Sequence, residues 1–380
     1  MCDLFIHEDV FSLVIDLLGV TEYPKLFCVS KSIHSFMLNH YFRYCIQTNK
    51  IPLSYIQTTN NLQTLILFDD DTIEDSVLKN LSKLRHLELP LNNKITDSGL
   101  EHIPLVTCLN LSRNETITDL GLKHIPLITN LNFDWNEKIT DLGLKCVPLV
   151  TRLNLCRCEI TDLGLKHIPL ITCLNLFFSR KITDLGLKHI PLITNLNLCR
   201  NENITDDGLK YISLVTDLHL SYNENITDSG LKYIPSVTNL NLDYNERITD
   251  LGLKFIPRVT KLVMYWNTHI TDAGLKYIPL VTHLDLNYNL NITDDGLKHI
   301  PLITNLRLRH NLNITDDGLK HIPLITHLDL YHNINITDDG LKHIPLITHL
   351  DVMHNLNITD NGLKYIPLVT NLYLSHKYYG

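Results

Sequence analysis

Histidine and cysteine are the side chains whose spacing in this sequence could support metal chemistry. His327 and His349 lie 22 residues apart, and a second column with the same spacing contains His310, His332, His354 and His376. A tetrahedral zinc site needs four nitrogen or sulfur ligands, whereas a straight column brings about two together. Cys156 and Cys158 form a Cys-x-Cys pair with no second pair. We therefore expect no metal site and no other cofactor.

Other kinds of chemistry find little support in the residue types. Nucleophilic catalysis needs a unique serine or cysteine beside a base, but nearly every His and Thr here is one of many copies. The net charge of −8 (33 Lys and Arg against 41 Asp and Glu) disfavours nucleic-acid binding. The longest apolar stretch, Val10 to Val20, contains Asp16 and is too short for a membrane span. We expect a protein that is not an enzyme.

The nine cysteines, together with an N-terminus that lacks the pattern of a signal peptide, favour a reducing compartment. We therefore expect a cytoplasmic protein, with the nucleus as the alternative. The short apolar stretch interrupted by Asp16 predicts no membrane association.

A repeat of 22 residues positions all of these side chains. Ile-Thr-Asp occurs thirteen times, from Ile95 to Ile358, and every step is 22 residues except one of 21 between Ile139 and Ile160. Thirteen of the 15 glycines and twelve of the 15 prolines keep fixed places in this unit. Because residues with special backbone requirements recur at one spacing, the sequence predicts one backbone path repeated as a solenoid.

Each unit contains a short strand and a short helix. Counting from its isoleucine as position 1, the Leu-x-Leu at positions 15 and 17 predicts a strand whose leucines face the core, while positions 14, 16 and 18 face outward. Thr at position 2 is suited to cap a helix, and Asp at position 3 suits its positive end. Pro at position 10 limits that helix to one or two turns.

An asparagine follows the strand in eleven units, and Cys158 and Ser179 replace it in the irregular stretch. We expect a structural ladder of buried, hydrogen-bonded amides rather than a catalytic role. Its members are Asn92, Asn114, Asn136, Asn201, Asn223, Asn245, Asn267, Asn289, Asn311, Asn333 and Asn355.

The Ile-Thr-Asp-x-Gly-Leu and Leu-x-Leu-x-x-Asn phrases resemble the leucine-rich-repeat family, and in particular its cysteine-containing subclass. The resemblance covers residues 51–380, with degenerate repeats at 51–94 and regular ones at 95–380. It implies an α/β solenoid with a curved parallel sheet of about 14–15 units.

Residues 1–50 do not repeat, and their two helical patterns resemble an F-box, the module that docks on Skp1 in cullin-based ubiquitin ligases. His7 stands where that family usually has proline, and no tryptophan follows Lys31. A helical cap that shields the first repeat is the alternative interpretation. The residues that the resemblance assigns to Skp1 binding are Ile6, His7, Val10, Val14, Ile15, Leu18, Leu26, Val29 and Lys31.

The outward strand positions and the position just before the asparagine predict a binding surface. Aromatic residues there suit a protein partner, although they could instead stack only on one another. The predicted surface contains Trp135, Phe177, Phe178, Tyr222, Tyr244, Tyr265, Trp266, Tyr288, Asp285, Arg307, Asp329 and Asp351.

The repeats and the N-terminal segment together predict an adaptor that recruits a protein target to a Skp1–cullin–F-box ubiquitin ligase. Units 314–335 and 336–357 are identical at 19 of 22 positions, a style that resembles the F-box/leucine-rich-repeat proteins of giant amoeba-infecting DNA viruses. That resemblance implies the host cytoplasm. The alternative is a stand-alone leucine-rich-repeat scaffold with a helical cap.

Overall fold

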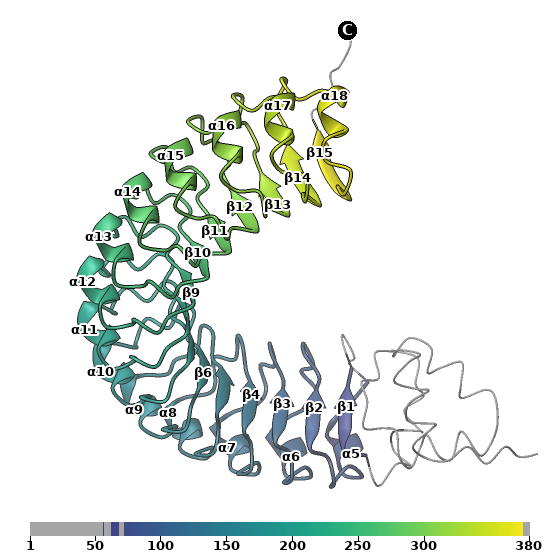
Figure 1. The fold of residues 1–380 in the computed structure, drawn as a ribbon. Helices are drawn as coiled ribbons and strands as arrows, with labels where there is room; N and C mark the ends of the chain where they lie inside the picture. The colour runs from purple at the N-terminus through teal and green to yellow at the C-terminus, as the bar shows by residue number, and fades with distance from the viewer. Residues whose placement is uncertain (1–55, 57–61, 68–71, 375–380) are drawn as a thin grey trace, which may run out of the picture. The chain divides into compact units, whose positions relative to one another are not determined.

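The computed structural model describes residue 56 and residues 62–67 and 72–374, which fall into two compact units. The first unit ends at Ile171 and the second begins at Thr172. In both units a short strand and a short helix alternate along the chain (Figure 1). The predicted F-box-like module at residues 1–50 lies outside the described residues.

The strands of each unit form a parallel ladder in which consecutive strands pair. Those of the first unit are β1 (Thr64–Ile66), β2 (His86–Glu88), β3 (Cys108–Asn110), β4 (Asn130–Asn132) and β5 (Arg152–Asn154). Those of the second unit are β6 (Cys173–Asn175), β7 (Asn195–Asn197), β8 (Asp217–His219), β9 (Asn239–Asn241), β10 (Lys261–Val263), β11 (His283–Asp285), β12 (Asn305–Arg307), β13 (His327–Asp329), β14 (His349–Val352) and β15 (Asn371–Leu374).

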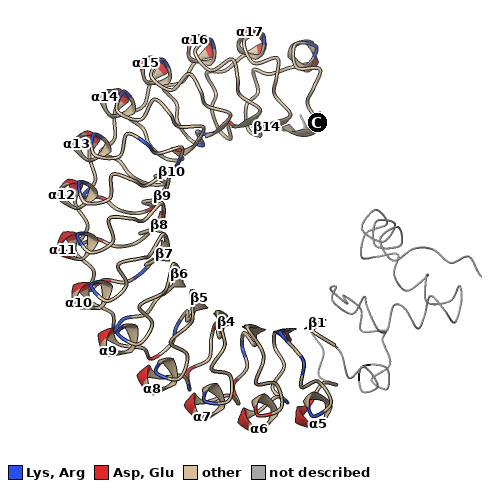
Figure 2. Cartoon of the chain, turned by 60° about the horizontal axis from the view of Figure 1, so that its bottom comes forward, with Lys and Arg blue, Asp and Glu red and all other residues tan. Residues whose placement is uncertain are grey.

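The helices α5 to α18 are single four-residue turns, as the proline at position 10 of most repeats predicts. The first unit contains α5 (Asp75–Leu78), α6 (Asp97–Leu100), α7 (Asp119–Leu122), α8 (Asp141–Leu144) and α9 (Asp162–Leu165). The second contains α10 (Asp184–Leu187), α11 (Asp206–Leu209), α12 (Asp228–Leu231), α13 (Asp250–Leu253), α14 (Asp272–Leu275), α15 (Asp294–Leu297), α16 (Asp316–Leu319), α17 (Asp338–Leu341) and α18 (Asp360–Leu363). Within each unit the helices lie on one side and the strands on the other (Figure 2).

The core of each unit lies between these two layers. Neighbouring strands pair without a shift in register, so that Leu262 lies opposite Leu284. The repeats contribute closely similar apolar sets to the core. In the repeat that starts at Ile270, all members are at most 2% exposed: Ile270, Leu275, Ile278, Val281, Leu284 and Leu286. The predicted leucine-rich-repeat solenoid is confirmed.

Within each unit, an aspartate and a threonine link each helix to the next one. The carboxylate of Asp228, at the start of α12, accepts hydrogen bonds from the backbone N–H of Thr249 (2.8 Å) and from its hydroxyl (2.6 Å). The Thr249 hydroxyl oxygen in turn accepts from the backbone N–H of Leu251 and caps α13. The sequence predicts the cap, but the bond between repeats is an additional finding. We call this arrangement the Asp–Thr clamp.

The clamp explains why glycine recurs at position 5. A β-carbon on Gly252 would lie 2.3 Å from Oδ1 of Asp228 and 3.2 Å from Cδ1 of Leu231. The Asp228 carboxylate cannot move aside without losing its bonds to Thr249. Close packing between neighbouring helices therefore requires glycine here, although the helical backbone itself does not.

No helix in the described part of the chain has the length and apolar character needed to cross a lipid bilayer.

Replacing Gly252 with alanine should break one Asp–Thr clamp. We expect the free energy of unfolding to fall by about 1–3 kcal/mol, because two partly buried hydrogen bonds are lost or distorted. Urea denaturation followed by circular dichroism measures this effect. The matched control is Leu251→Ala, because Leu251 is 66% exposed and Ala273 occupies the same place in the next repeat. Equal stability of the two variants would contradict the clamp.

Candidate functional site

The side of each ladder opposite the buried leucines carries the outward strand residues, and we call it the sheet face. In the second unit its C-terminal part carries most of the charged residues at position 16. The residues at position 16 of successive repeats there are Asp285, Arg307, Asp329, Asp351 and Tyr373, and those at position 14 are His283, Asn305, His327, His349 and Asn371.

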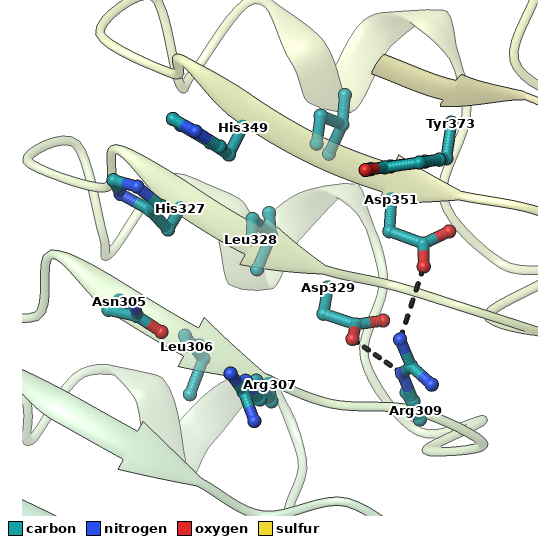
Figure 3. Close-up of a pocket in the computed structure, with 11 residues that line it drawn as sticks. Asn305, Leu306, Arg307, Arg309, His327, Leu328, Asp329, His349, Asp351 and Tyr373 are labelled. Carbon is teal, nitrogen blue, oxygen red and sulfur yellow. Dashed lines mark hydrogen bonds and ion pairs between the residues drawn. The ribbon is translucent and has the colours of Figure 1, made fainter. Parts of the chain in front are cut away.

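A hollow of about 220 Å³ lies on the sheet face between β12 and β15. Figure 3 shows Arg309 directed toward Asp329 and Asp351, with Tyr373 beside Asp351. The hollow therefore offers charged groups of both signs, imidazole rings and a phenol to a ligand. Its lining consists of Asn305, Leu306, Arg307, Arg309, His327, Leu328, Asp329, His349, Leu350, Asp351 and Tyr373.

Arg309 organises the charges in the hollow. Its Nε donates to Asp329 at 2.5 Å, and one terminal nitrogen donates to Asp351 at 3.3 Å. These two carboxylate side chains are only 15% and 17% exposed, whereas the guanidinium side chain is 42% exposed. One cation thus spans two repeats and balances two half-buried anions, and it keeps an exposed edge for a partner.

Burial changes the titration of several groups on this face. Desolvation raises the pKa of the Asp329 carboxyl, and the hydrogen bond from Arg309 offsets part of that rise. Desolvation also raises the pKa of Asp285, which accepts a hydrogen bond from Arg307 at 3.4 Å. The pKa of His327 is lowered by desolvation and by the neighbouring His349, whose ring stacks on it at 4.0 Å.

A continuous stack of rings runs beside the sheet face of the second unit. Neighbouring ring centroids lie 4.3–6.4 Å apart and the planes are within 23° of parallel. We call this set the ring stack, and its members are Tyr222, Tyr244, Trp266, Tyr288, His310, His332 and His354.

Stacking occupies the ring faces and leaves ring edges to solvent, since Tyr222 is 39% and Trp266 45% exposed. The sequence left two uses open for these rings, and the structure shows mutual stacking together with accessible edges. Tyr265 lies against Tyr244 and Tyr288, with centroids 5.4 and 5.3 Å away.

The remaining predicted aromatic residues do not join the ring stack. In the first unit, Arg157 lies over the Trp135 ring at 3.9 Å. In the second unit, Phe177 and Phe178 are 6.3 Å apart, and Arg180 lies over Phe178 at 4.3 Å. Cation–π contacts of this kind hold the rings in place, and none of these residues lines the hollow.

The asparagines of the predicted ladder are all buried, and ten of the eleven bond from repeat to repeat, whereas the side chain of Asn333 has no hydrogen-bond partner among the described residues. Asn289, for example, donates to the backbone carbonyl oxygens of Asn267 (2.8 Å) and Ile270 (3.1 Å). Cys158 takes the place of an asparagine, and its thiol lies 3.0 Å from the carbonyl oxygen of Asn136. Desolvation by burial is the main cause that raises the pKa of this thiol to about 12, which keeps it protonated as a donor.

Sequence reasoning missed two features of this surface. The first is Arg309, for which the available signal was an arginine at position 18 one repeat before Asp329. The second is the left-handed backbone at position 19, where φ is 57–66° in thirteen non-glycine residues. No glycine or asparagine marks that position, so composition gave no sign of it.

One group of three possible metal ligands lies in the described residues, on the first unit: His86, Glu88 and Cys108.

Comparisons with known proteins agree with the repeat. Six segments match the family model described as "Leucine Rich repeat", namely residues 80–103, 102–125, 214–234, 233–256, 279–300 and 343–366. The chain therefore contains leucine-rich repeats. A comparison with curated protein sequences finds no match.

Solved structures share the fold at low sequence identity. A chain of the TLR13–ssRNA13 complex is 20% identical with a TM-score of 0.64, covering 87% of this chain and 51% of that one. An internalin (inlF) from Listeria monocytogenes is 23% identical with a TM-score of 0.60, covering 79% and 88%. A chain of the yeast Rad7–Elc1 complex is 16% identical with a TM-score of 0.53, covering 80% and 88%.

This chain thus spans about half the length of the chain that it matches in the TLR13 complex. The shared fold is a leucine-rich-repeat scaffold, which presents an extended surface suited to protein–protein interaction.

Arg309→Gln should destabilise the fold at pH 7 and have little effect at about pH 3. The pKa of Asp329 is raised in the folded state. The fold is therefore more stable when Asp329 is protonated, and this stability is lost as pH rises through that pKa and the carboxylate becomes charged. Arg309 counters this cost, and its loss should lower stability by about 1 kcal/mol at neutral pH. Urea midpoints at the two pH values measure the difference.

The control for this measurement is Arg307→Gln, because Arg307 is 59% exposed and makes one ion pair at 3.4 Å. We expect a smaller effect from it. A loss of stability in Arg309→Gln that is the same at both pH values would contradict the electrostatic role.

Proposed function

We propose that this chain is a non-catalytic adaptor that binds a protein target through the sheet face and ring stack of its second unit. The hollow around Arg309 is the observation that carries the proposal. It combines a half-exposed guanidinium, two half-buried carboxylates and the exposed Tyr373. Arginine and aromatic residues concentrate binding energy at protein interfaces.

The charges on this surface favour a protein target over a nucleic acid. Asp285, Asp329 and Asp351 lie on the sheet face, and the whole chain carries a net charge of −8. Phosphate backbones would be repelled by such a surface. A protein segment with both a basic and an acidic side chain would find complementary groups near Asp285, Arg307 and Arg309.

We further propose that residues 1–50 dock on a Skp1-like protein, which would place the target near a cullin-based ubiquitin ligase. The support is the F-box resemblance of the sequence around Val10, Val14, Leu18 and Lys31. A cytoplasmic location, in the host cell if the source is viral, belongs to the same proposal. The alternative function is a stand-alone scaffold whose N-terminal helices only cap the repeats.

A photoreactive phenylalanine derivative in place of Tyr373 should crosslink the target. Tyr373 is 58% exposed and lines the hollow, so a bound protein would lie within reach of the probe. The matched control is the same replacement at Tyr211, which is 39% exposed and follows helix α11. Crosslinked products should appear at Tyr373 alone and diminish when Arg307→Glu is added. Identical products from both positions would refute binding on the sheet face.

Full-length protein should retain Skp1 in a pull-down, and Val10→Asp or Leu18→Asp should reduce retention more than about tenfold. Charge in an apolar contact surface of the F-box kind opposes docking. Leu142→Asp is the control, because Leu142 is 70% exposed on helix α8. A third N-terminal variant, Lys31→Glu, reverses one charge on the proposed docking surface and should reduce Skp1 retention less. Retention unaffected by the three N-terminal variants, or no retention at all, would leave the stand-alone scaffold as the function.

A further inference from the structure

Strands β2 and β3 bring three different metal-binding side chains together on the sheet face of the first unit. His86 and Glu88 are two residues apart on β2 and therefore project from the same side. Cys108 begins β3 directly opposite His86 in the parallel register. The potential ligand atoms of these three residues all lie within 4.8 Å of one another.

The spacing of the three groups is close to that of a tetrahedral zinc site. Zinc bonds of about 2.0–2.3 Å place neighbouring ligand atoms roughly 3.3–3.7 Å apart. His86 Nε2 and Glu88 Oε1 are now 2.7 Å apart and share a hydrogen bond. Rotation of the His86 and Glu88 side chains that moves their ligand atoms by about 1 Å would separate this pair enough to admit the ion. The strands would not need to move.

We propose that His86, Glu88 and Cys108 bind one zinc ion. The set offers an imidazole nitrogen, a carboxylate oxygen and a sulfur, which are the three ligand types that zinc takes in proteins. All three side chains are half-buried, so the ligands are held by the strands but remain open to solvent on one side. Three protein ligands leave a fourth position for water or for a group from a bound partner.

Binding exchanges protons for the metal. The Cys108 thiol releases its proton to solvent and bonds as the thiolate, and His86 takes the tautomer with its proton on Nδ1. Without metal, desolvation and the adjacent Glu88 carboxylate raise the pKa of Cys108. The doubly charged ion reverses both effects, because it compensates the buried negative charges of the thiolate and of Glu88.

The histidine columns of the sequence do not provide such a set. A column supplies the same position from neighbouring strands, whereas this site uses two positions of β2 and one of β3. Cys173 occupies the equivalent place at the start of β6, but it belongs to no such group in the described part of the chain. Only the combination of His86, Glu88 and Cys108 meets the distance condition among the described residues.

Zinc titration of the full chain, expressed without a histidine tag, tests the site. Competition with a chromogenic chelator should show that Cys108→Ser and His86→Gln each weaken zinc binding more than about tenfold, because each removes a direct ligand. Cys173→Ser is the matched control and should bind as the unaltered chain does. Cobalt in place of zinc should give a thiolate charge-transfer absorption that Cys108→Ser removes.

Other ligands in the chain, such as Cys2, Cys28 and Cys45, are present in every variant and contribute an equal background. Circular dichroism of Cys108→Ser establishes that the repeats remain folded, since serine has nearly the shape of cysteine. Zinc binding that is absent in the unaltered chain, or that Cys108→Ser and His86→Gln leave unchanged, would overturn the proposal. A cobalt spectrum without thiolate absorption would overturn it as well.

Discussion

The Asp–Thr clamp is the interaction on which the rest of the structure depends, because it fixes how far each repeat lies from the next. Asp250 accepts from the backbone N–H and the hydroxyl of Thr271. The same pair of bonds recurs within each unit, from Asp75–Thr96 to Asp141–Thr161 in the first and from Asp184–Thr205 to Asp338–Thr359 in the second. The helices can approach this closely because a glycine of the next helix lies against the carboxylate, as Gly252 lies against Asp228. The parallel strands on the other layer are then held at hydrogen-bonding distance without a shift in register.

Fixed register separates the residues that build the fold from those that can vary. In most repeats the apolar residues at positions 15 and 17 pack in the core and the asparagine amide forms hydrogen bonds. The side chains at the outward strand positions do not pack in the core, so Asn, Asp, Arg, His or Tyr can stand there without destabilising it. A side chain placed there by one repeat meets its counterpart from the next at the strand spacing of about 4.8 Å. Ring stacks and charge pairs follow directly from that spacing.

The repeat period made most of the fold predictable, because glycine, proline and leucine each have one physical reason for their place. The period did not predict that each aspartate bonds to the threonine of the next repeat. It also did not predict the left-handed backbone at position 19. Tyr244 adopts φ 57° because the chain turns there, and no single residue type is obliged to fill that conformation. Arg309 was missed because its bonds reach one and two repeats ahead, and such reach depends on side-chain rotamers rather than on period.

Departures from the repeat are therefore the informative part of this surface. A column such as His310, His332 and His354 can arise by duplication alone, and its stacking at 4.7 and 4.3 Å needs no ligand to explain it. Arg309 is different, since no other described repeat has arginine at its position, and it neutralises two carboxylates that duplication placed side by side. An uncompensated pair of half-buried anions would weaken the fold, and Arg309 offsets that cost while its own side chain stays 42% exposed.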